Sequence, residues 1–203
     1  MLTKLKQRVQ ALLAQEARIA HRMGLTPNGI TIIGVTLALF SAVAYADWSG
    51  EPFYLIAAAV LLLLSGFSDA LDGVVARLYQ QTTVFGGFLD SLLDRYADAS
   101  VFIGIMLGGL CDIFWGLVAL TGSVLVSYAR ARAEAANTKM ESVGFAERAE
   151  RIIILASASI VAVFWQPYTT MNAAVILLAI ITNFTVLQRS IYAYRMMKRK
   201  TEI

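Results

Sequence analysis

Four aspartates in two closely spaced pairs are the residues of this chain best suited to chemistry. Asp69 and Asp72 lie three positions apart, and Asp90 and Asp94 lie four apart. On a helix, either spacing places both members of a pair on one face. The first pair directly follows residues 52–68, a run without any charged side chain. Four carboxylates beside a bilayer need positive charge to balance them, and divalent cations such as Mg²⁺ prefer carboxylate oxygens.

The spacing of the two pairs predicts a two-metal site at the inner membrane surface. Because the connection between the pairs is short, we expect their helices to be antiparallel neighbours on which all four carboxylates converge. Two metal ions in such a site clamp the attacking and leaving oxygens of an in-line phosphoryl displacement. The alternative interpretation is a structural carboxylate cluster or solvated helix ends. Asp98 lies one turn further on, either as another ligand or, in the interpretation we favour, paired with an arginine or turned away from the metal face.

Composition indicates that membrane helices position these aspartates. The chain has 203 residues, of which 58% are hydrophobic and 15% charged, whereas a soluble domain averages about 25% charged residues. The single cysteine, Cys111, excludes an internal disulfide framework and a cysteine-based zinc site. The single histidine, His21, has no second histidine with which to form a metal site or a triad. A net charge of +3 gives no reason to expect a nucleic-acid partner.

Long apolar stretches predict six membrane-spanning helices, since a span needs about 20 residues. The last stretch is too long for one span, and Trp165–Thr170 offers a turn within it. The stretches are Gly29–Ala46, Pro52–Ser68, Ala99–Cys111 (extending back to about Val84), Ile113–Ala129 and Ile152–Gln188. The predicted fold is therefore an all-α integral membrane protein.

The basic residues predict the orientation of these spans. All 17 lysines and arginines fall in the leader, the second-to-third connection with Arg95 early in the third span, the fourth-to-fifth connection and the tail. Cytoplasmic loops collect Lys and Arg, so we expect both termini to be cytoplasmic. Residues 1–24 lack the early apolar stretch of a cleavable signal and are predicted to form an amphipathic juxtamembrane helix on the membrane surface. Residues 25–203 are predicted to form one six-helix domain.

The aspartate segment resembles the signature of the CDP-alcohol phosphotransferase family at every fixed position. It reads Asp69-Ala-Leu-Asp72-Gly73-Val-Val-Ala76-Arg77, followed by Gly86, Asp90 and Asp94. The resemblance implies a six-helix membrane enzyme, usually a homodimer, in which an alcohol attacks the β-phosphorus of a CDP-linked lipid and displaces CMP. It also implies two Mg²⁺ ions, with Mn²⁺ as the alternative, held by Asp69, Asp72, Asp90 and Asp94. Asp94 would in addition be the general base, and the implied location is a prokaryotic cell membrane with the active site facing the cytoplasm.

Five residues are expected to bind the CDP-lipid. By the resemblance, Gly73, Arg77 and Gly86 would hold the CDP moiety. Thr26-Pro27-Asn28-Gly29-Ile30-Thr31, which opens the first span, is similar to a family element near the nucleotide pocket and adds Asn28 and Thr31. Helix capping is an equal alternative for that element, because Pro at a helix start with a nearby Thr is mostly a cap.

Three arginines predict an anionic acceptor. Arg130, Arg151 and Arg189 each border an apolar stretch, and an arginine fork pairs well with a phosphate. The surrounding segments 127–134, 147–151 and 188–189 resemble the phosphatidylinositol-phosphate and archaetidylinositol-phosphate synthase branch. The implied acceptor is inositol 1-phosphate, with its phosphate held by the three arginines. Arg130 stands where many members have Lys, and Ala149 stands where the actinobacterial enzymes have Pro.

Several alternatives stay open at this point. Glycerol 3-phosphate is the rival acceptor, as in a phosphatidylglycerophosphate synthase, and the donor is CDP-diacylglycerol or CDP-archaeol. From another class, the chain is a non-catalytic divalent-cation-binding membrane protein, although ion binding alone needs no nucleotide-sized gap framed by glycines. Gly104 and Gly108 form a small-residue packing motif that serves either a homodimer or packing within one chain.

Overall fold

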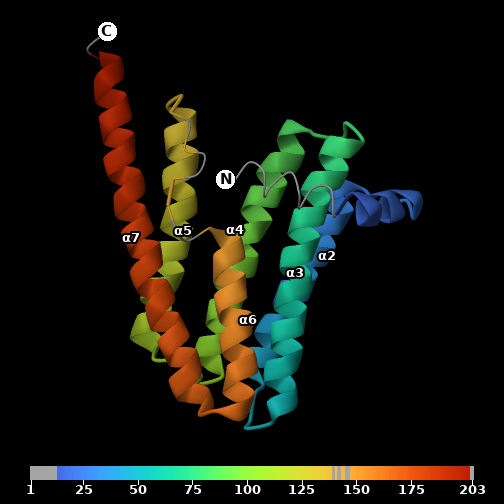
Figure 1. The fold of residues 1–203 in the computed structure, drawn as a ribbon, viewed down its shortest axis with the longest axis vertical. Coiled ribbons are helices and arrows are strands. Elements are labelled where there is room, and N and C mark those ends of the chain that lie inside the picture. Colours follow the sequence, from blue (N-terminus) through green and yellow to red (C-terminus); the bar gives the residue numbers. More distant parts are fainter. Residues whose placement is uncertain (1–12, 139, 141–142, 145–146, 202–203) are drawn as a thin grey trace.

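The computed structural model describes residues 13–201 except 139, 141–142 and 145–146, and these residues form a bundle of long helices (Figure 1). A shorter helix at residues 13–22 precedes the bundle. The long helices lie where the sequence predicts them, and the expected turn after Phe164 is confirmed. Their bounds are α2 (Pro27–Ala46), α3 (Pro52–Leu78), α4 (Val84–Leu107), α5 (Ile113–Ala135), α6 (Arg148–Phe164) and α7 (Pro167–Thr201).

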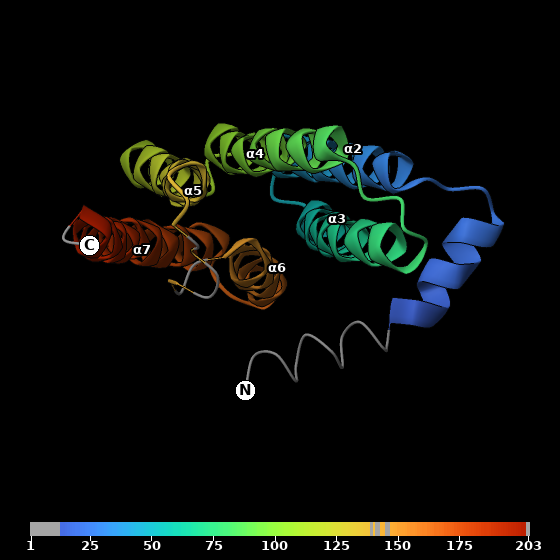
Figure 2. The ribbon, with the colours of Figure 1, turned by 90° about the horizontal axis from the view of Figure 1, so that it is seen from above.

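The helices form two groups that meet along the middle of the bundle (Figure 2). Helix α2 packs against α3 and α4, while α7 packs against α5 and α6. Contacts of α3 with α6 and of α4 with α5 join the two groups. The site described below lies where α2, α3, α4 and α6 come together.

Helices α3 and α4 are antiparallel, as predicted, but they are not packed directly on each other. Within the described residues, each of them packs against α2 instead. Small residues of α2 permit this arrangement, since a Cβ added at Gly34 would lie 3.1 Å from Ser68 Cβ of α3. The two aspartate pairs therefore face each other across a space and not across a packed interface.

The Gly104–Gly108 motif of α4 packs against α2 of the same chain. A Cβ at Gly104 would collide with the backbone of Ala42, and a Cβ at Gly108 would collide with the carbonyl oxygen of Tyr45. Of the two roles left open for this motif, packing within one chain is the one that the structure shows. The homodimer stays a prediction.

Within the described residues, four helices are long and apolar enough to cross a membrane: α2, α3, α5 and residues 167–198 of α7. Large apolar side chains on the outside of the bundle agree, since Phe40, Leu63 and Phe184 are 59%, 42% and 53% exposed. Helix α4 carries three aspartates along one face, and α6 has only 17 residues.

The helix at residues 13–22 attaches to the end of α3. Ala17 and Ala20 are buried in a cluster with Val74 and Val75. The imidazole of His21 stacks on the ring of Tyr79, with centroids 3.6 Å apart. Residues 1–12 of the expected leader helix lie outside the described residues.

Candidate active site

Three aspartates bring their carboxylates together at one end of the space between α3 and α4. Oxygen atoms of Asp69, Asp72 and Asp90 all lie within 4.8 Å of one another. Asp90 Oδ1 is buried and has no hydrogen-bond partner. A buried carboxylate oxygen without a donor is costly unless a cation or donor completes it. The donor set is all oxygen and therefore suits Mg²⁺ or Mn²⁺.

Asp94, the fourth predicted ligand, lies one turn further along α4 and has a different environment. It is buried, and its Oδ1 lies 2.5 Å from Nη1 of Arg148. Arg95 is a weaker neighbour, with Nη1 3.8 Å from Asp94 Oδ2. All four aspartates nevertheless line one narrow space, together with Gly34 and Arg148. The structure thus brings the four into one cluster, of which three are already within reach of a common ion.

Arg148 is a site residue that was not predicted from the sequence. Its Nη1 also lies 3.0 Å from Asp69 Oδ1, and its Nε lies 3.4 Å from Asp98 Oδ1. The Arg148 side chain is only 11% exposed. One signal in the sequence could have identified it, because Arg148 and Arg151 are three residues apart and share a helix face.

Asp98 pairs with arginines and is not in the ligand group. It contacts Arg148 through one oxygen and Arg151 through the other. The favoured interpretation of Asp98 is therefore confirmed. Arg151 is 3% exposed, so this ion pair lies inside the bundle.

The residues expected to bind the CDP-lipid all line one cavity of about 230 Å³. Asp72 and Asp90 form the wall that this cavity shares with the metal-binding cluster. The five predicted residues in its lining are Asn28, Thr31, Gly73, Arg77 and Gly86. The cavity is thus a polar space directly beside the carboxylates.

Helix starts hold the walls of this cavity in place. Thr83 caps α4 by accepting a hydrogen bond from the backbone N–H of Gly86 at 2.9 Å. A Cβ at Gly86 would lie 2.8 Å from Thr83 Oγ1 and 3.1 Å from Asn28 Oδ1, so this corner has no room for a side chain. The absence of a side chain lets the backbone face the cavity.

The Thr26–Thr31 element serves both roles that the sequence left open. Thr26 caps α2 by accepting from the backbone N–H of Gly29 at 3.2 Å. Thr31 lines the cavity, and its hydroxyl donates to Asp72 Oδ2 at 2.6 Å. A hydrogen bond to one carboxylate oxygen fixes the orientation of Asp72 and leaves the other oxygen for a cation.

Two of the three predicted acceptor arginines are buried: Arg151 in the first turn of α6 and Arg189 in the second half of α7. Arg189 is 2% exposed and donates hydrogen bonds to the backbone oxygens of Val126 at 2.6 Å and Val143 at 2.8 Å. Val126 lies one turn before Arg130 on α5, so Arg189 reaches the helix that carries Arg130.

Arg130 differs from the other two in its surroundings. Its side chain is 47% exposed and pairs with Glu134, one turn along α5, at 2.9 Å. An exposed pair of this kind contributes little to stability. Arg130 is therefore able to leave Glu134 for a better anion at small energetic cost.

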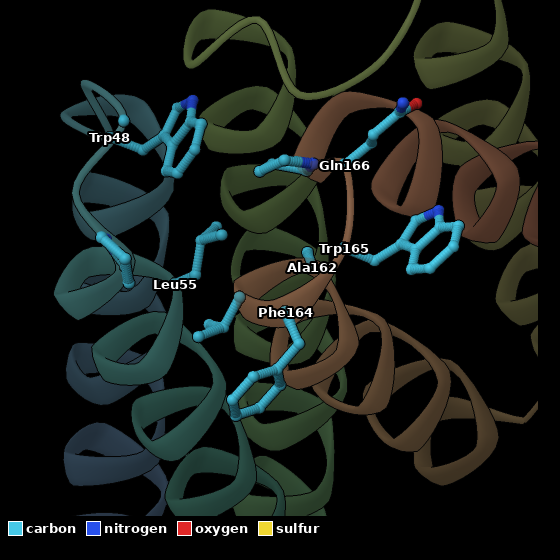
Figure 3. A pocket seen from close by; sticks show the side chains of 10 residues that line it. Trp48, Leu55, Ala162, Phe164, Trp165 and Gln166 are labelled. Atoms are coloured by element: carbon cyan, nitrogen blue, oxygen red, sulfur yellow. The ribbon is translucent and has the colours of Figure 1, made fainter.

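A second and larger cavity, of about 440 Å³, lies at the opposite end of the bundle (Figure 3). Trp48, Leu55, Phe164 and Trp165 contribute to its lining, which contains no acidic or basic side chain. From Pro52 to Asp69 along α3 is about 25 Å at 1.5 Å per residue. This cavity offers no group for acid–base or metal chemistry and lies far from the carboxylates.

Comparison with known proteins places the chain in a family. A model of the CDP-alcohol phosphatidyltransferase family matches residues 24–193. Archaetidylinositol phosphate synthase of Methanothermobacter thermautotrophicus is 45% identical over 180 residues, covering 89% of each chain. The enzyme of the same name from Pyrococcus horikoshii is 40% identical and covers 93% of this chain and 94% of its own length.

Solved structures give the same result for the fold. The crystal structure of Mycobacterium tuberculosis phosphatidylinositol phosphate synthase with CDP-DAG bound superposes with a TM-score of 0.75 at 31% identity. The match covers 91% of this chain and 94% of that one. The same enzyme in complex with manganese and citrate also gives a TM-score of 0.75, at 32% identity. The chain therefore belongs to the CDP-alcohol phosphatidyltransferase family, as the resemblance of its aspartate segment had implied.

Proposed function

We propose that this chain transfers a phosphatidyl or archaetidyl group from a CDP-linked lipid to inositol 1-phosphate and releases CMP. One observation carries this proposal. The cavity lined by all five predicted CDP-lipid residues shares Asp72 and Asp90 with the three-carboxylate cluster. A nucleotide site next to a metal-binding site is what displacement at a diphosphate needs. A protein that only binds cations has no use for the adjoining cavity.

The proposed topology has six spans, with both termini and the active site on the cytoplasmic side of a prokaryotic cell membrane. The four apolar helices and the one-sided distribution of Lys and Arg support it. Helix α4 would be a span whose hydropathy is lowered by the aspartates of the site. Intramembrane carboxylates of this kind usually mark function.

Asp69, Asp72, Asp90 and Asp94 would hold two divalent cations, Mg²⁺ or Mn²⁺, which would neutralise the diphosphate and the departing CMP. The chain's own residues prepare this arrangement. The hydroxyl of Thr31 fixes the orientation of the Asp72 carboxylate. The buried Oδ1 of Asp90 has no hydrogen-bond partner and can therefore bind a cation. Gly73 and Gly86 leave the cavity wall open to the nucleotide, with Arg77 beside Gly73 at its rim.

Asp94 is proposed as the general base. It is the cluster's most deeply placed carboxylate on α4, and a carboxylate within reach of a hydroxyl can accept its proton. The hydroxyl oxygen of the acceptor would bond to the β-phosphorus as its proton passes to Asp94. The bond from the β-phosphorus to the bridging oxygen would break, and CMP would leave with that oxygen.

The acceptor is proposed from the arginines and the relatives. Arg151, Arg189 and Arg130 would bind the phosphate of inositol 1-phosphate, since guanidinium groups recognise phosphates by paired hydrogen bonds. The two archaeal relatives, at 45% and 40% identity, are named for an archaetidyl product, which supports CDP-archaeol as donor. The structural neighbour with CDP-DAG bound supports CDP-diacylglycerol.

The experiment uses the purified protein in detergent with Mg²⁺ and each combination of donor and acceptor. CMP release is measured with CDP-archaeol or CDP-diacylglycerol and with inositol 1-phosphate or glycerol 3-phosphate. We expect release with inositol 1-phosphate and only background with glycerol 3-phosphate. Release with glycerol 3-phosphate alone would overturn the proposed acceptor, and no release with any pair would overturn the proposed activity.

A further inference from the structure

Arg148 connects the carboxylate cluster to the part of the site that contains Arg151. Its guanidinium contacts Asp69 on α3 and both Asp94 and Asp98 on α4. Asp98 in turn contacts Arg151, one of the proposed acceptor residues. A continuous chain of ion pairs therefore runs from the metal-binding cluster to the acceptor side.

These ion pairs join α4 to the first turn of α6, beside a buried apolar cluster to which both helices contribute. Among the described residues, the two helices do not pack directly on each other, although each packs against other neighbours. Arg148 is the first residue of α6. The contacts of Arg148 with the aspartates therefore help to position the start of α6, which also packs against α3.

The charges in the cluster are unevenly compensated. In the part of the chain that the structure describes, the ion pairs to arginine involve Asp69 and Asp94 but not Asp72 or Asp90. Carboxylates this close together repel one another unless a cation lies between them. Arg148 supplies that positive charge on one side of the cluster only.

We propose that Arg148 is a positioning residue with two linked roles. It neutralises Asp69 and Asp94 when no divalent cation does so, and it ties this pair through Asp98 to Arg151. The fork of the guanidinium is necessary for this, because one side chain must reach three carboxylates at once. The second role rests on the proposed function, whereas the first concerns cation binding alone.

The first test is the affinity for Mn²⁺ without any substrate, measured by titration calorimetry on the purified full-length chain. Arg148→Gln removes a cation that competes for Asp69 and Asp94, so Mn²⁺ should bind about tenfold more tightly than to wild type. Arg132→Gln is the matched control, since Arg132 is exposed on α5 and should leave the affinity unchanged. Equal or weaker Mn²⁺ binding by a monodisperse Arg148→Gln protein would overturn the neutralising role.

The second test uses Arg148→Lys, which keeps the positive charge and also serves if Arg148→Gln does not fold. An ammonium group is compact and cannot span Asp94 and Asp98 as the fork does. We expect the KM for inositol 1-phosphate to rise about tenfold while kcat changes less. If the KM of Arg148→Lys for inositol 1-phosphate equalled that of wild type, the proposed connection of Arg148 to Arg151 would be overturned. Absence of any transfer by wild type would instead count against the proposed function and leave the Mn²⁺ result decisive for Arg148.

Discussion

Asp90 and Asp94 are one helical turn apart and share a chemical type, yet their partners differ. Asp90 has a buried oxygen with no hydrogen-bond partner, whereas Asp94 is held by Arg148 at 2.5 Å. The first environment suits a metal ligand. The second keeps a carboxylate in a fixed orientation beside the cluster, as a base requires.

Replacing Asp94 with Asn tests this difference directly. Asn has the same shape but accepts a proton poorly, so turnover should fall by about 10²- to 10⁴-fold. Mn²⁺ binding should largely persist, because Asp69, Asp72 and Asp90 already lie within 4.8 Å of one another. CMP release and Mn²⁺ titration on the same preparation measure both effects. Turnover close to that of wild type would refute the assignment of Asp94.

Substitution of Gly86 gives a second prediction for a single residue. In Gly86→Ala the added Cβ would meet Thr83 Oγ1 at 2.8 Å and Asn28 Oδ1 at 3.1 Å, so the cavity wall must shift. We expect the KM for the CDP-lipid to rise about tenfold. The KM for inositol 1-phosphate serves as the internal control and should stay near its wild-type value. If the two constants rose together, the cavity would not be specific to the nucleotide.

Helix α4 shows how an element is adapted to hold the site. Its first half carries Asp90 and Asp94, and its C-terminal end packs so closely on α2 that glycine is needed at positions 104 and 108. Helix α2 in turn holds α3 and α4 on either side of the site. The separation between the aspartate pairs is therefore set by α2 and not by the loop that connects them.

The close contact of α4 with α2 gives a prediction about stability. Gly104→Val would force a side chain into the backbone of Ala42 and should destabilise the fold by about 1–3 kcal/mol or more. Thermal unfolding in detergent would register this as a lower Tm. Gly87→Ala is the stability control on the same helix, since its added Cβ would meet nothing within 4 Å. A Gly104→Val protein as stable as the control would contradict the observed packing.

Much of the fold could be predicted from the sequence, because apolar stretches and aspartate spacing are local features. They gave the six long helices, the turn after Phe164 and the grouping of the four aspartates. Hydropathy alone underestimated the length of α3, which continues past Ser68 to Leu78. The reason is that the carboxylates interrupt the apolar run without interrupting the helix.

Contacts between distant segments could not be predicted. The position of α2 between α3 and α4 depends on backbone approach at Gly34 and Gly104, which composition does not reveal. The sequence singled out Arg151 and not Arg148, and only the packing shows that Arg148 reaches the cluster. Arg130 similarly resembled Arg189 by position, although one is exposed and the other buried.

At the scale of the whole molecule, the two ends of the bundle are chemically different. One end combines the carboxylate cluster, the polar cavity and the arginines. The other end has the tryptophan-containing cavity of Figure 3. Tryptophans gather at membrane interfaces, so this end fits the outer surface of the proposed six-span arrangement.

Cysteine labelling in intact cells tests that orientation. Residues 49 and 136 are both exposed, the first in the α2–α3 loop and the second directly after α5. In intact cells, Ser49→Cys should react with a membrane-impermeant maleimide. Ala136→Cys should react only after the cells are lysed. The native Cys111 should stay silent, because it is 5% exposed and burial raises the pKa of its thiol to about 11. Its reactive thiolate is therefore scarce at pH 7. Labelling of Ala136→Cys in intact cells would show that the orientation in the membrane is the reverse of the one proposed.

The most direct test of the central claim is to follow the acceptor itself into the lipid product. Purified protein is incubated with Mg²⁺, a CDP-linked lipid and isotope-labelled inositol 1-phosphate, and the lipid and nucleotide fractions are analysed by mass spectrometry. Our account predicts a lipid that carries the label and the acceptor's phosphate, formed in equal amount with CMP. CMP formed without labelled lipid, or a labelled product that retains the cytidine nucleotide, would contradict it.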